Sequence, residues 1–452
     1  MDKKKFNHYF ENSNLWESYL KVESEMAQAQ AKVGIIPKKA ADIISKNSSL
    51  EVVGFRNIQH SFNTTKSLIL SIAQELSKKC GSSGGYVHWG GTTQNIIDTG
   101  NKLVIREAHK NILEELSKSL FKLSKMANSH SKTPMLGRTL GRNAIPISFG
   151  FKVAGWIENL VRLDKSFIDA EKSIFCLFFG GAVGAMHGFE NKGYNFTEAL
   201  AKKLGLNNSL VPNRTSTDTS IHYLVSLSIQ GMIVEKISKE ILLLMSESIN
   251  EISEAQSKGQ IGSSTMPHKV NPQIVLNVIS NASLLKGKVS SYLNAGSPVH
   301  EGDKVTNDTI DILMRESITL SYELFCLFNL LLDTIKVNKK KMKENLYDAK
   351  DYIASENLMF KLGKFIGRQK SHDLIHSIIE KSIKESVSII DNLHKSKIIT
   401  KHLSMDEINH YMDPKNYMGQ SEKISKNASV LGLKYSKLIK KRLLKSDLNV
   451  RT

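Results

Sequence analysis

Residues 256–272, QSKGQIGSSTMPHKVNP, bring together side chains that can move protons and bind anions. The segment holds hydroxyls, an imidazole, an ammonium group and a side-chain amide. Gly259 and Gly262 allow the backbone to approach a ligand closely, because glycine has no Cβ. Successive backbone N–H groups beside Lys269 could form a cradle for an anion. The residues alone leave two interpretations open, an anion-binding loop and a solvated connection between helices.

Two other segments carry a histidine next to polar residues. Residues 82–91, SSGGYVHWGG, are rich in glycine and contain His88. Residues 298–303, PVHEGD, place His300 beside Glu301, and such a pair can orient a proton carrier. The alternative for this pair is the first turn of a helix, where the helix dipole favours acidic side chains.

Long helices must position these segments. No proline occurs between residues 37 and 134, 146 and 212, 212 and 267, or 298 and 414. Within these stretches apolar residues recur mostly every three or four positions, which predicts helices over residues 98–129, 145–171, 219–254 and 306–334. Around residues 241–245 the sequence is apolar on nearly all faces, as is typical inside a bundle or at a subunit interface. Alternating strand patterns are almost absent, so we expect an all-α fold.

Composition excludes several classes of protein. The chain has 452 residues, 40% of them hydrophobic, which is enough for one large domain or two to three smaller ones. The net charge of +18 suits an anionic ligand. Lysine, isoleucine and asparagine are all abundant, which is typical of a genome-wide bias, so we expect no nucleic-acid partner. The three cysteines are far apart and predict neither a disulfide framework nor a zinc site.

The sequence also predicts where the protein works and what it needs. The N-terminus lacks the apolar region of a secretory signal, and no apolar stretch is long enough to span a membrane. We therefore expect a cytoplasmic protein with no membrane partner. The sequence contains no phosphate-binding loop, no dinucleotide fingerprint and no HExxH motif, so we expect no cofactor and no metal.

Three long motifs resemble one known superfamily. GSSTMPHKVNP at residues 262–272 resembles the signature loop of the fumarase/aspartase superfamily. YVHWGGTTQNIIDTG at 86–100 and GRTLGRNAIPISFGFKVAGW at 137–156 are similar to segments of two of its branches, adenylosuccinate lyase and 3-carboxy-cis,cis-muconate cycloisomerase. GRQKSHDLI at 367–375 and MDPKNYMG at 412–419 resemble the C-terminal domain of the adenylosuccinate lyase type. The chain is identified as a divergent member of this group over essentially its whole length.

The resemblance implies a mainly helical homotetramer. It predicts three helical domains, at residues 1–100, 101–345 and 346–452, with the signature loop at 256–272 in the central one. Long central helices of four subunits would form a common core. Each active site would combine the three motifs from three different subunits and bind a small di- or tricarboxylate.

The chemistry that the resemblance implies is anti β-elimination from a succinyl group, with release of fumarate. Ser263 matches the base, whose alkoxide backbone dipoles and an ammonium group could stabilise. His88, His300 and Glu301 are the other catalytic candidates. The substrate-binding candidates are His60, Thr92, Thr93, Thr139, Ser264, Lys269 and Asn271. A structural role for His60 and a loop-shaping role for Ser264 stay open.

Several positions depart from the pattern of the adenylosuccinate lyases. Leu140 stands where they usually have a histidine that serves as general acid, and leucine cannot transfer a proton. The cycloisomerase branch also lacks that histidine. Asn95 stands in place of an aspartate, Thr217 and Gly302 in place of arginines, and Ala185 in place of a threonine. Because a polar site discriminates strongly when its partners change, these departures indicate an altered substrate.

Three functions from different classes therefore remain. The first is a lyase that releases fumarate from a substituted succinate, as an adenylosuccinate-like carbon–nitrogen lyase does. The second is a cycloisomerase that acts on a carboxymuconate. The third is a non-catalytic homologue with a structural or regulatory role. A Ser263→Ala variant separates the third class from the enzymes, because only an enzyme would lose its activity.

Overall fold

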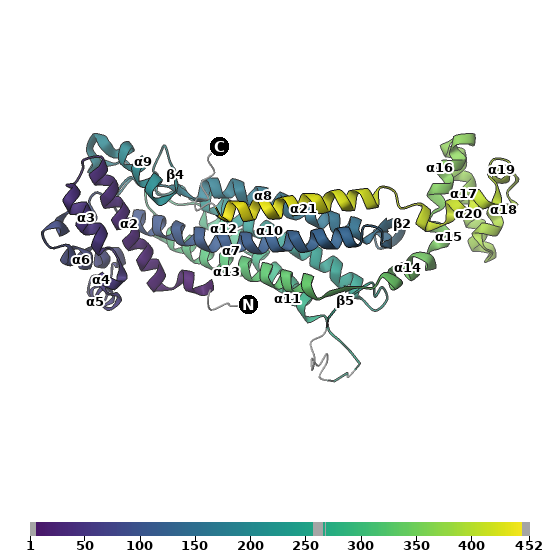
Figure 1. Cartoon of the computed structure of the whole chain (residues 1–452), viewed down its shortest axis with the longest axis horizontal. Coiled ribbons are helices and arrows are strands. Elements are labelled where there is room, and N and C mark those ends of the chain that lie inside the picture. The colour runs from purple at the N-terminus through teal and green to yellow at the C-terminus, as the bar shows by residue number, and fades with distance from the viewer. Residues whose placement is uncertain (1–5, 256–264, 267, 445–452) are drawn as a thin grey trace.

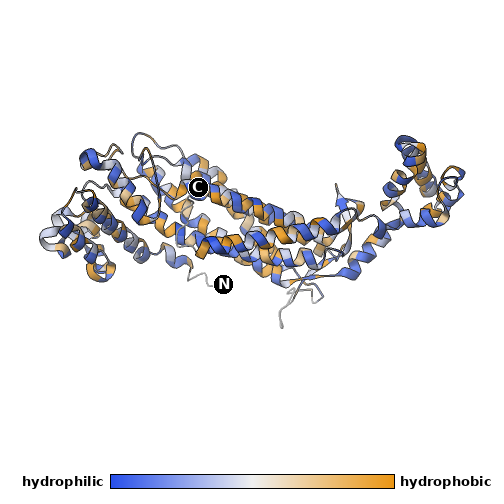
Figure 2. Ribbon diagram, turned by 45° about the horizontal axis from the view of Figure 1, so that its top comes forward, coloured by the Kyte–Doolittle hydropathy of each residue, from blue (hydrophilic) through white to orange (hydrophobic). Residues whose placement is uncertain are grey.

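The computed structural model describes residues 6–255, 265–266 and 268–444. Its centre is an elongated bundle of long helices that lie side by side (Figure 1). These helices are α7 (Thr93–Ser129), α8 (Phe149–Ile174), α10 (Asp218–Met245), α13 (Lys304–Thr334) and α21 (Ser421–Leu444). The all-α fold class is confirmed, and the helices expected over 98–129 and 306–334 are present. Apolar residues recur along the bundle helices, as periodic burial requires (Figure 2).

Two of the expected helices are shorter than predicted. Helix α10 ends at Met245 rather than at 254, because the backbone leaves the helical region at Ser246 and turns through Asn250, whose φ is +50°. Helix α8 begins at Phe149 rather than at 145. The hydroxyl of Ser148 accepts the Phe151 N–H at 3.1 Å and caps this helix. Pro146 has no N–H to donate, and residues 145–148 form a strand instead.

Three small two-stranded sheets occur in the described part of the chain. Strands β1 (Pro134–Thr139) and β2 (Arg142–Ser148) form an antiparallel hairpin. Strands β3 (Cys176–Leu177) and β4 (Asn207–Asn208) pair in parallel, and β5 (Ile252–Glu254) pairs antiparallel with β6 (Ile335–Val337). Apart from the hairpin, these strands have only two or three residues each and leave no alternating pattern in the sequence.

The N-terminal helices cover one end of the bundle (Figure 1). Helix α2 packs against α7, where the Tyr19 hydroxyl donates to Asn101 Oδ1 at 2.9 Å. The smaller elements before α7 are η1 (His8–Phe10), α2 (Asn12–Lys32), α3 (Lys38–Asn47), α4 (Leu50–Val53), α5 (Phe55–Thr65), α6 (Leu68–Cys80) and η2 (Gly81–Tyr86). Those between α8 and α13 are η3 (His187–Lys192), α9 (Gly193–Leu204), α11 (Gln273–Gly287) and α12 (Val289–Ala295).

A second group of short helices lies at the other end of the molecule (Figure 1). It has its own apolar cluster, which includes Leu358, Leu362, Leu393 and Ile408. Its elements are α14 (Lys339–Asp348), α15 (Lys350–Ile353), α16 (Ser355–Ile366), α17 (Arg368–Glu385), α18 (Ile389–Lys395), α19 (Lys397–Thr400), α20 (Met405–Met412) and η4 (Pro414–Asn416). The division into three domains at residues 100 and 345 stays a prediction.

Helix α21 returns from this group to the bundle and packs closely against α7 and α8. Apart from Ile439, its buried residues form a stripe of small side chains, namely Ser421, Ser425, Ser429, Gly432 and Ser436. Ser117 Oγ donates to the Ser436 carbonyl at 3.0 Å, and Ser436 Oγ donates to the Ser117 carbonyl at 2.9 Å. Small side chains let the two backbones approach, and the reciprocal hydrogen bonds satisfy the buried hydroxyls.

A buried polar network also ties α21 to the bundle. His109 Nε2 donates to Glu171 at 2.9 Å, and the Tyr223 hydroxyl donates to His109 Nδ1 at 2.9 Å. Arg442 on α21 donates to Asp164 at 2.8 Å and lies 3.6 Å from Glu171. Burial raises the pKa of Asp164, although the Arg442 guanidinium acts in the opposite direction. In such surroundings the arginine compensates buried carboxylates and anchors the last helix.

No helix within the described residues is long and apolar enough to cross a membrane.

Candidate active site

His88 lies between η2 and α7 and is held by a buried carboxylate. Its Nδ1 donates to Glu23 Oε1 on α2 at 2.6 Å, and the Glu23 side chain is 0% exposed. Burial lowers the pKa of His88, but the hydrogen bond and charge of Glu23 outweigh it, so the pKa is raised. Because Glu23 occupies Nδ1, Nε2 is the ring atom left to exchange a proton with a ligand.

The N-terminus of α7 begins beside this histidine. A Cβ added to Gly91 would lie 3.6 Å from the His88 ring, so the ring lies against the backbone just before Thr92. Thr92 is half-buried and makes no side-chain capping bond to α7, and Thr93 is exposed. A helix N-terminus with nearby hydroxyls favours an anion, because its first N–H groups lack partners within the helix.

Asn95 fastens a glycine-rich loop to this N-terminus. Its buried side-chain amide donates to the Phe178 carbonyl at 3.2 Å and accepts the Gly181 N–H at 3.0 Å. An aspartate, which is the expected residue here, could accept from Gly181 but could not donate to Phe178. The Asn95 amide therefore has a structural role, because it holds the loop at residues 178–186 beside α7.

His300 and Glu301 come to the same end of the bundle. Both are exposed and lie on the connection between α12 and α13. The next residue, Gly302, packs against the Arg214 guanidinium, which donates to the Ala182 carbonyl at 2.7 Å. The loop that Asn95 holds thus links the His88 segment to the His300 segment.

Thr139 lies elsewhere, at the tip of the β1–β2 hairpin. It is exposed, and Leu140 and Gly141 form the two-residue turn with φ of +51° and +72°. Arg138 donates to both carboxylate oxygens of Glu251, at 2.6 and 3.0 Å. This ion pair joins the hairpin to the residues just before β5, and thus to the base of the signature loop.

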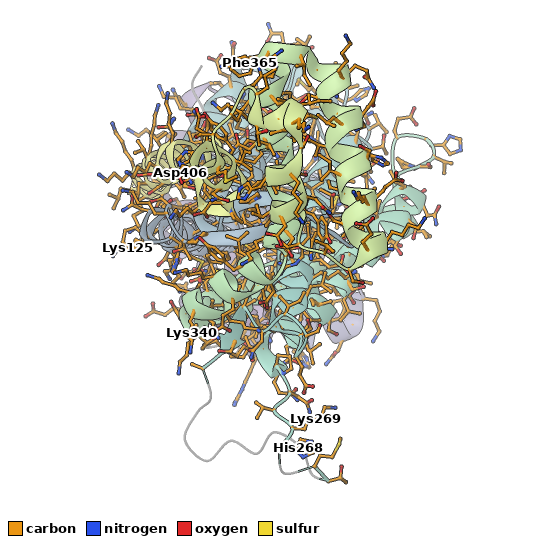
Figure 3. All side chains as sticks on the ribbon, turned by 90° about the vertical axis from the view of Figure 1, so that its right-hand side faces the viewer. Lys125, His268, Lys269, Lys340, Phe365 and Asp406 are labelled. Carbon is orange, nitrogen blue, oxygen red and sulfur yellow. The ribbon has the colours of Figure 1, made fainter. Side chains whose placement is uncertain are left out.

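The residues that flank the signature loop are joined to each other. Glu254 accepts the N–H groups of Ile274 and Val275, at 3.2 and 2.7 Å, and so caps the N-terminus of α11. His268 and Lys269 are exposed on a segment that extends away from the bundle (Figure 3). Asn271 is half-buried. Ser263 and Ser264 lie outside the described residues.

The predicted site residues therefore fall into separate groups. His88, Thr92, Thr93, His300 and Glu301 gather at one end of the bundle. Thr139, Lys269 and Asn271 belong to the other end, and His60 is exposed on α5. Helix α7 separates Thr93 from the hairpin, and its 37 residues span about 55 Å at 1.5 Å per residue. Within one chain, Thr93 and Thr139 cannot contact the same small molecule.

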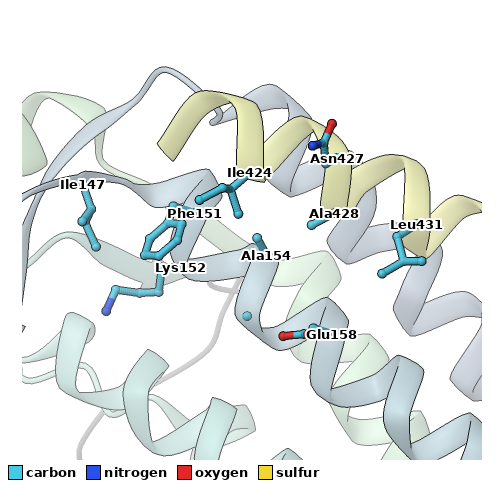
Figure 4. A pocket seen from close by; sticks show the side chains of 10 residues that line it. Ile147, Phe151, Lys152, Ala154, Glu158, Ile424, Asn427, Ala428 and Leu431 are labelled. Atoms are coloured by element: carbon cyan, nitrogen blue, oxygen red, sulfur yellow. The ribbon is translucent and has the colours of Figure 1, made fainter. Parts of the chain in front are cut away.

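Two recesses differ in chemistry. A cleft of about 50 Å³ beside the first group is lined by polar side chains of α7, α13 and the turn before α10, among them Asp98, Lys102, Arg214 and Asp311. A groove of about 750 Å³ between α8 and α21 is mainly apolar and holds one lysine and one glutamate, Lys152 and Glu158 (Figure 4). None of the predicted site residues that the structure describes lines that groove.

The sequence prediction missed two residues that shape the site, Glu23 and Arg214. It named Asn95 as a departure from an aspartate but missed its role as an anchor of the loop. For Glu23 a signal was present, because helical spacing places it on the buried face of α2 with Leu20 and Met26. A charged residue on an apolar face needs a partner. For Arg214 no comparable signal exists, since its neighbour Gly302 is 88 positions away in the sequence.

Comparisons with known proteins place the chain in a family. The family model described as lyase matches residues 3–287, and the model described as adenylosuccinate lyase C-terminus matches residues 351–428. An adenylosuccinate lyase of Pyrococcus horikoshii is 30% identical over 420 residues, which cover 92% of this chain and 93% of that protein. An N-acetyl-S-(2-succino)cysteine lyase of Enterococcus italicus is 31% identical over 401 residues, 88% of each chain.

A solved structure shares the fold. The 3-carboxy-cis,cis-muconate lactonizing enzyme of Pseudomonas putida superposes with a TM-score of 0.83 at 24% identity, covering 96% of this chain and 98% of that one. The chain therefore belongs to the lyase family, and within the fumarase/aspartase superfamily it is related to the adenylosuccinate lyases.

Proposed function

We propose that this enzyme cleaves a succinyl compound by β-elimination and releases fumarate. The observation that carries the proposal is the His88–Glu23 pair beside the N-terminus of α7. The raised pKa of His88 suits a group that must hold a proton and deliver it to a leaving group. The adjacent helix terminus and Thr92 suit a substrate carboxylate.

In the proposed reaction, Ser263 removes a proton from the carbon beside one carboxylate. The electron pair forms the double bond of fumarate, and the bond from the neighbouring carbon to nitrogen or sulfur breaks. His88 Nε2 then protonates the departing heteroatom. Lys269 and Asn271 hold the carboxylate on which negative charge develops, and such preorganised contacts are typically worth about 10²–10³ in rate each. No cofactor takes part.

The proposed active site is shared between subunits of a homotetramer. Its support is the separation of about 55 Å that α7 imposes between Thr93 and the hairpin. One chain cannot close such a site on a small di- or tricarboxylate, whereas neighbouring chains that lie antiparallel can. The apolar groove between α8 and α21, and exposed apolar residues of α10 such as Met232 and Leu243, fit burial against other copies.

Proton NMR of the full-length protein tests this proposal. The protein is incubated with adenylosuccinate, N-acetyl-S-(2-succino)cysteine, argininosuccinate or 3-carboxymuconate. Fumarate should form from one of the three succinyl compounds, and the co-product names the leaving group. Ser263→Ala should abolish the signal while the oligomer stays intact. Fumarate production that survives this substitution would exclude Ser263 as the base.

The second candidate is a cycloisomerase, which Leu140 favours. This residue is fully exposed at the hairpin tip and offers no proton where adenylosuccinate lyases usually carry a histidine. In the same NMR experiment, lactone formed from 3-carboxymuconate without fumarate from any substrate would support this function. No change in any of the four compounds would favour a non-catalytic homologue.

A further inference from the structure

Arg214 stands in a rigid turn between the His88 segment and the His300 segment. Asn213 Oδ1 accepts the backbone N–H of Thr215 at 3.1 Å and its hydroxyl at 2.8 Å, which fixes the turn. Thr217 Oγ1 donates to the Gly296 carbonyl at 3.0 Å and ties the turn to the connection before α13. The side chain is therefore carried by a backbone that is fastened on both sides.

The guanidinium of Arg214 occupies space that Gly302 leaves open. A Cβ on Gly302 would lie 2.5 Å from Arg214 Nη2 and 2.9 Å from its Cζ. Any other residue at 302 would have to displace the guanidinium. The sequence pattern predicts an arginine at position 302, but the chain has a glycine there. Arg214 places its guanidinium beside that position instead.

Most of the hydrogen-bonding capacity of this guanidinium is unused within the described residues. Nη1 donates to the Ala182 carbonyl at 2.7 Å, and the buried Nε has no hydrogen-bond partner there. An arginine has five N–H donors in a planar fork that matches a carboxylate. A buried donor without a partner is costly, so it points to a ligand that completes the set.

Among the described residues that line the cleft, Arg214 is the cation without an ion-pair partner. Lys102 Nζ is already engaged by Asp98 Oδ2 at 2.8 Å and by the Cys176 carbonyl at 2.8 Å. Asp311 accepts from Asn101 Nδ2 at 3.1 Å, and burial, opposed by Arg315, raises its pKa to about 6. The carboxylates of the cleft thus have partners of their own, and the Arg214 fork is free of an ion pair with them.

We propose that Arg214 binds a carboxylate of the substrate, and that Gly302 determines specificity by admitting its guanidinium. This inference rests on the proposed function for its substrate class, a dicarboxylate. It adds an arginine to the site, and its positive charge replaces that of the arginines expected at positions 217 and 302. A dicarboxylate product such as fumarate would meet the Arg214 fork in addition to the N-terminus of α7.

Calorimetric titration of the full-length protein with fumarate and with succinate tests the inference. Arg214→Gln should weaken the binding of both dicarboxylates about 10- to 100-fold, because it removes charge-assisted hydrogen bonds. Arg214→Lys should fall between this variant and the wild type, since it keeps the charge but not the fork. Arg162→Gln, which removes an exposed arginine of α8, is the matched control and should bind like the wild type.

A double-mutant cycle tests the role of Gly302. Gly302→Ala should weaken binding in the wild type but have little further effect in the Arg214→Gln background, because the displaced guanidinium is then absent. Equal effects of Gly302→Ala in both backgrounds would overturn its proposed role. Unchanged dicarboxylate affinity in Arg214→Gln, or no binding of either dicarboxylate by the wild type, would overturn the inference as a whole.

The failure of this inference differs from the failure of the proposed function. Fumarate production with an unchanged KM in Arg214→Gln would leave the elimination standing and remove Arg214 from the site. Dicarboxylate binding that depends on Arg214, without fumarate from any succinyl compound, would leave the arginine site standing and remove the elimination.

Discussion

Strained backbone marks several of the residues to which the sequence pattern points. His88, Leu140 and His300 have φ of +60°, +51° and +53°, a region that side chains other than glycine and asparagine rarely adopt. Each such residue costs on the order of 1–3 kcal/mol and persists where the surrounding structure imposes it. For His88 the surrounding structure is visible, since Glu23 fixes the ring. These outliers agree with a functional role for the segments that carry them.

The pair formed by His88 and Glu23 makes a prediction about pH dependence. As a general acid, His88 must be protonated, so activity should fall as the pH rises through its pKa. Glu23→Gln removes the charge that raises this pKa and leaves the burial that lowers it. The alkaline limb of kcat/KM against pH should therefore move to lower pH. A limb that stays in place would show that the titrating group is not His88.

Asp311 predicts a pH-dependent effect on stability. Its pKa of about 6 lies above the value of an unfolded aspartate, so the folded state prefers the protonated form. The ionised Asp311 carboxylate therefore destabilises the folded state. This destabilisation is complete above about pH 6 and disappears as the pH falls toward 4. Asp311→Asn should stabilise the protein by about 3 kcal/mol at pH 8 and by less than about 1 kcal/mol at pH 4. Thermal unfolding at both pH values checks this, and equal gains at both would contradict it.

At the scale of elements, the docking of α21 depends on Gly432. A Cβ at this position would lie 2.2 Å from Ser124 Oγ and 2.9 Å from Ile157 Cγ2. Gly432→Val should therefore destabilise the protein by about 1–3 kcal/mol, the usual range for overpacking. Gly287→Ala is the matched control, because it lies at the end of helix α11 and a Cβ there meets nothing within 4 Å. A melting temperature of Gly432→Val equal to that of the control would contradict the close packing.

The long helices were predictable from the sequence, but their partners were not. Three- and four-residue spacing over proline-free stretches was sufficient for α7, α10 and α13. The β1–β2 hairpin was missed because burial does not alternate along its strands: β1 has three consecutive buried residues, and β2 begins with two exposed ones. The docking of α21 on α7 joins residues that are 319 positions apart. It uses serines and a glycine, and such a composition is typical of a polar surface helix.

The site was predictable only in part, for the same physical reason. Sequence motifs identify residue types in order along the chain, and so His88, Thr92 and Lys269 could be named. The contacts that position these residues join segments that are far apart in the sequence. Glu23 reaches His88 across 65 positions, and Arg214 fills the space left by Gly302. The order of the motifs along the chain also does not reveal that α7 separates the motif at 86–100 from the motif at 137–156.

At the scale of the whole molecule, the proposed active site combines residues of neighbouring chains, as the separation of its residue groups along α7 suggests. A direct test co-expresses two inactive chains, Ser263→Ala and His88→Gln, and measures fumarate release by the mixed oligomer. If the two residues come from different chains, random assembly should restore about a quarter of wild-type activity, because a site then receives both intact residues in one case out of four. Ser263→Ala mixed with Lys269→Ala is the control and should stay inactive, since both residues lie on one loop. Activity of the Ser263→Ala and His88→Gln mixture no higher than that of either variant alone would contradict the shared site.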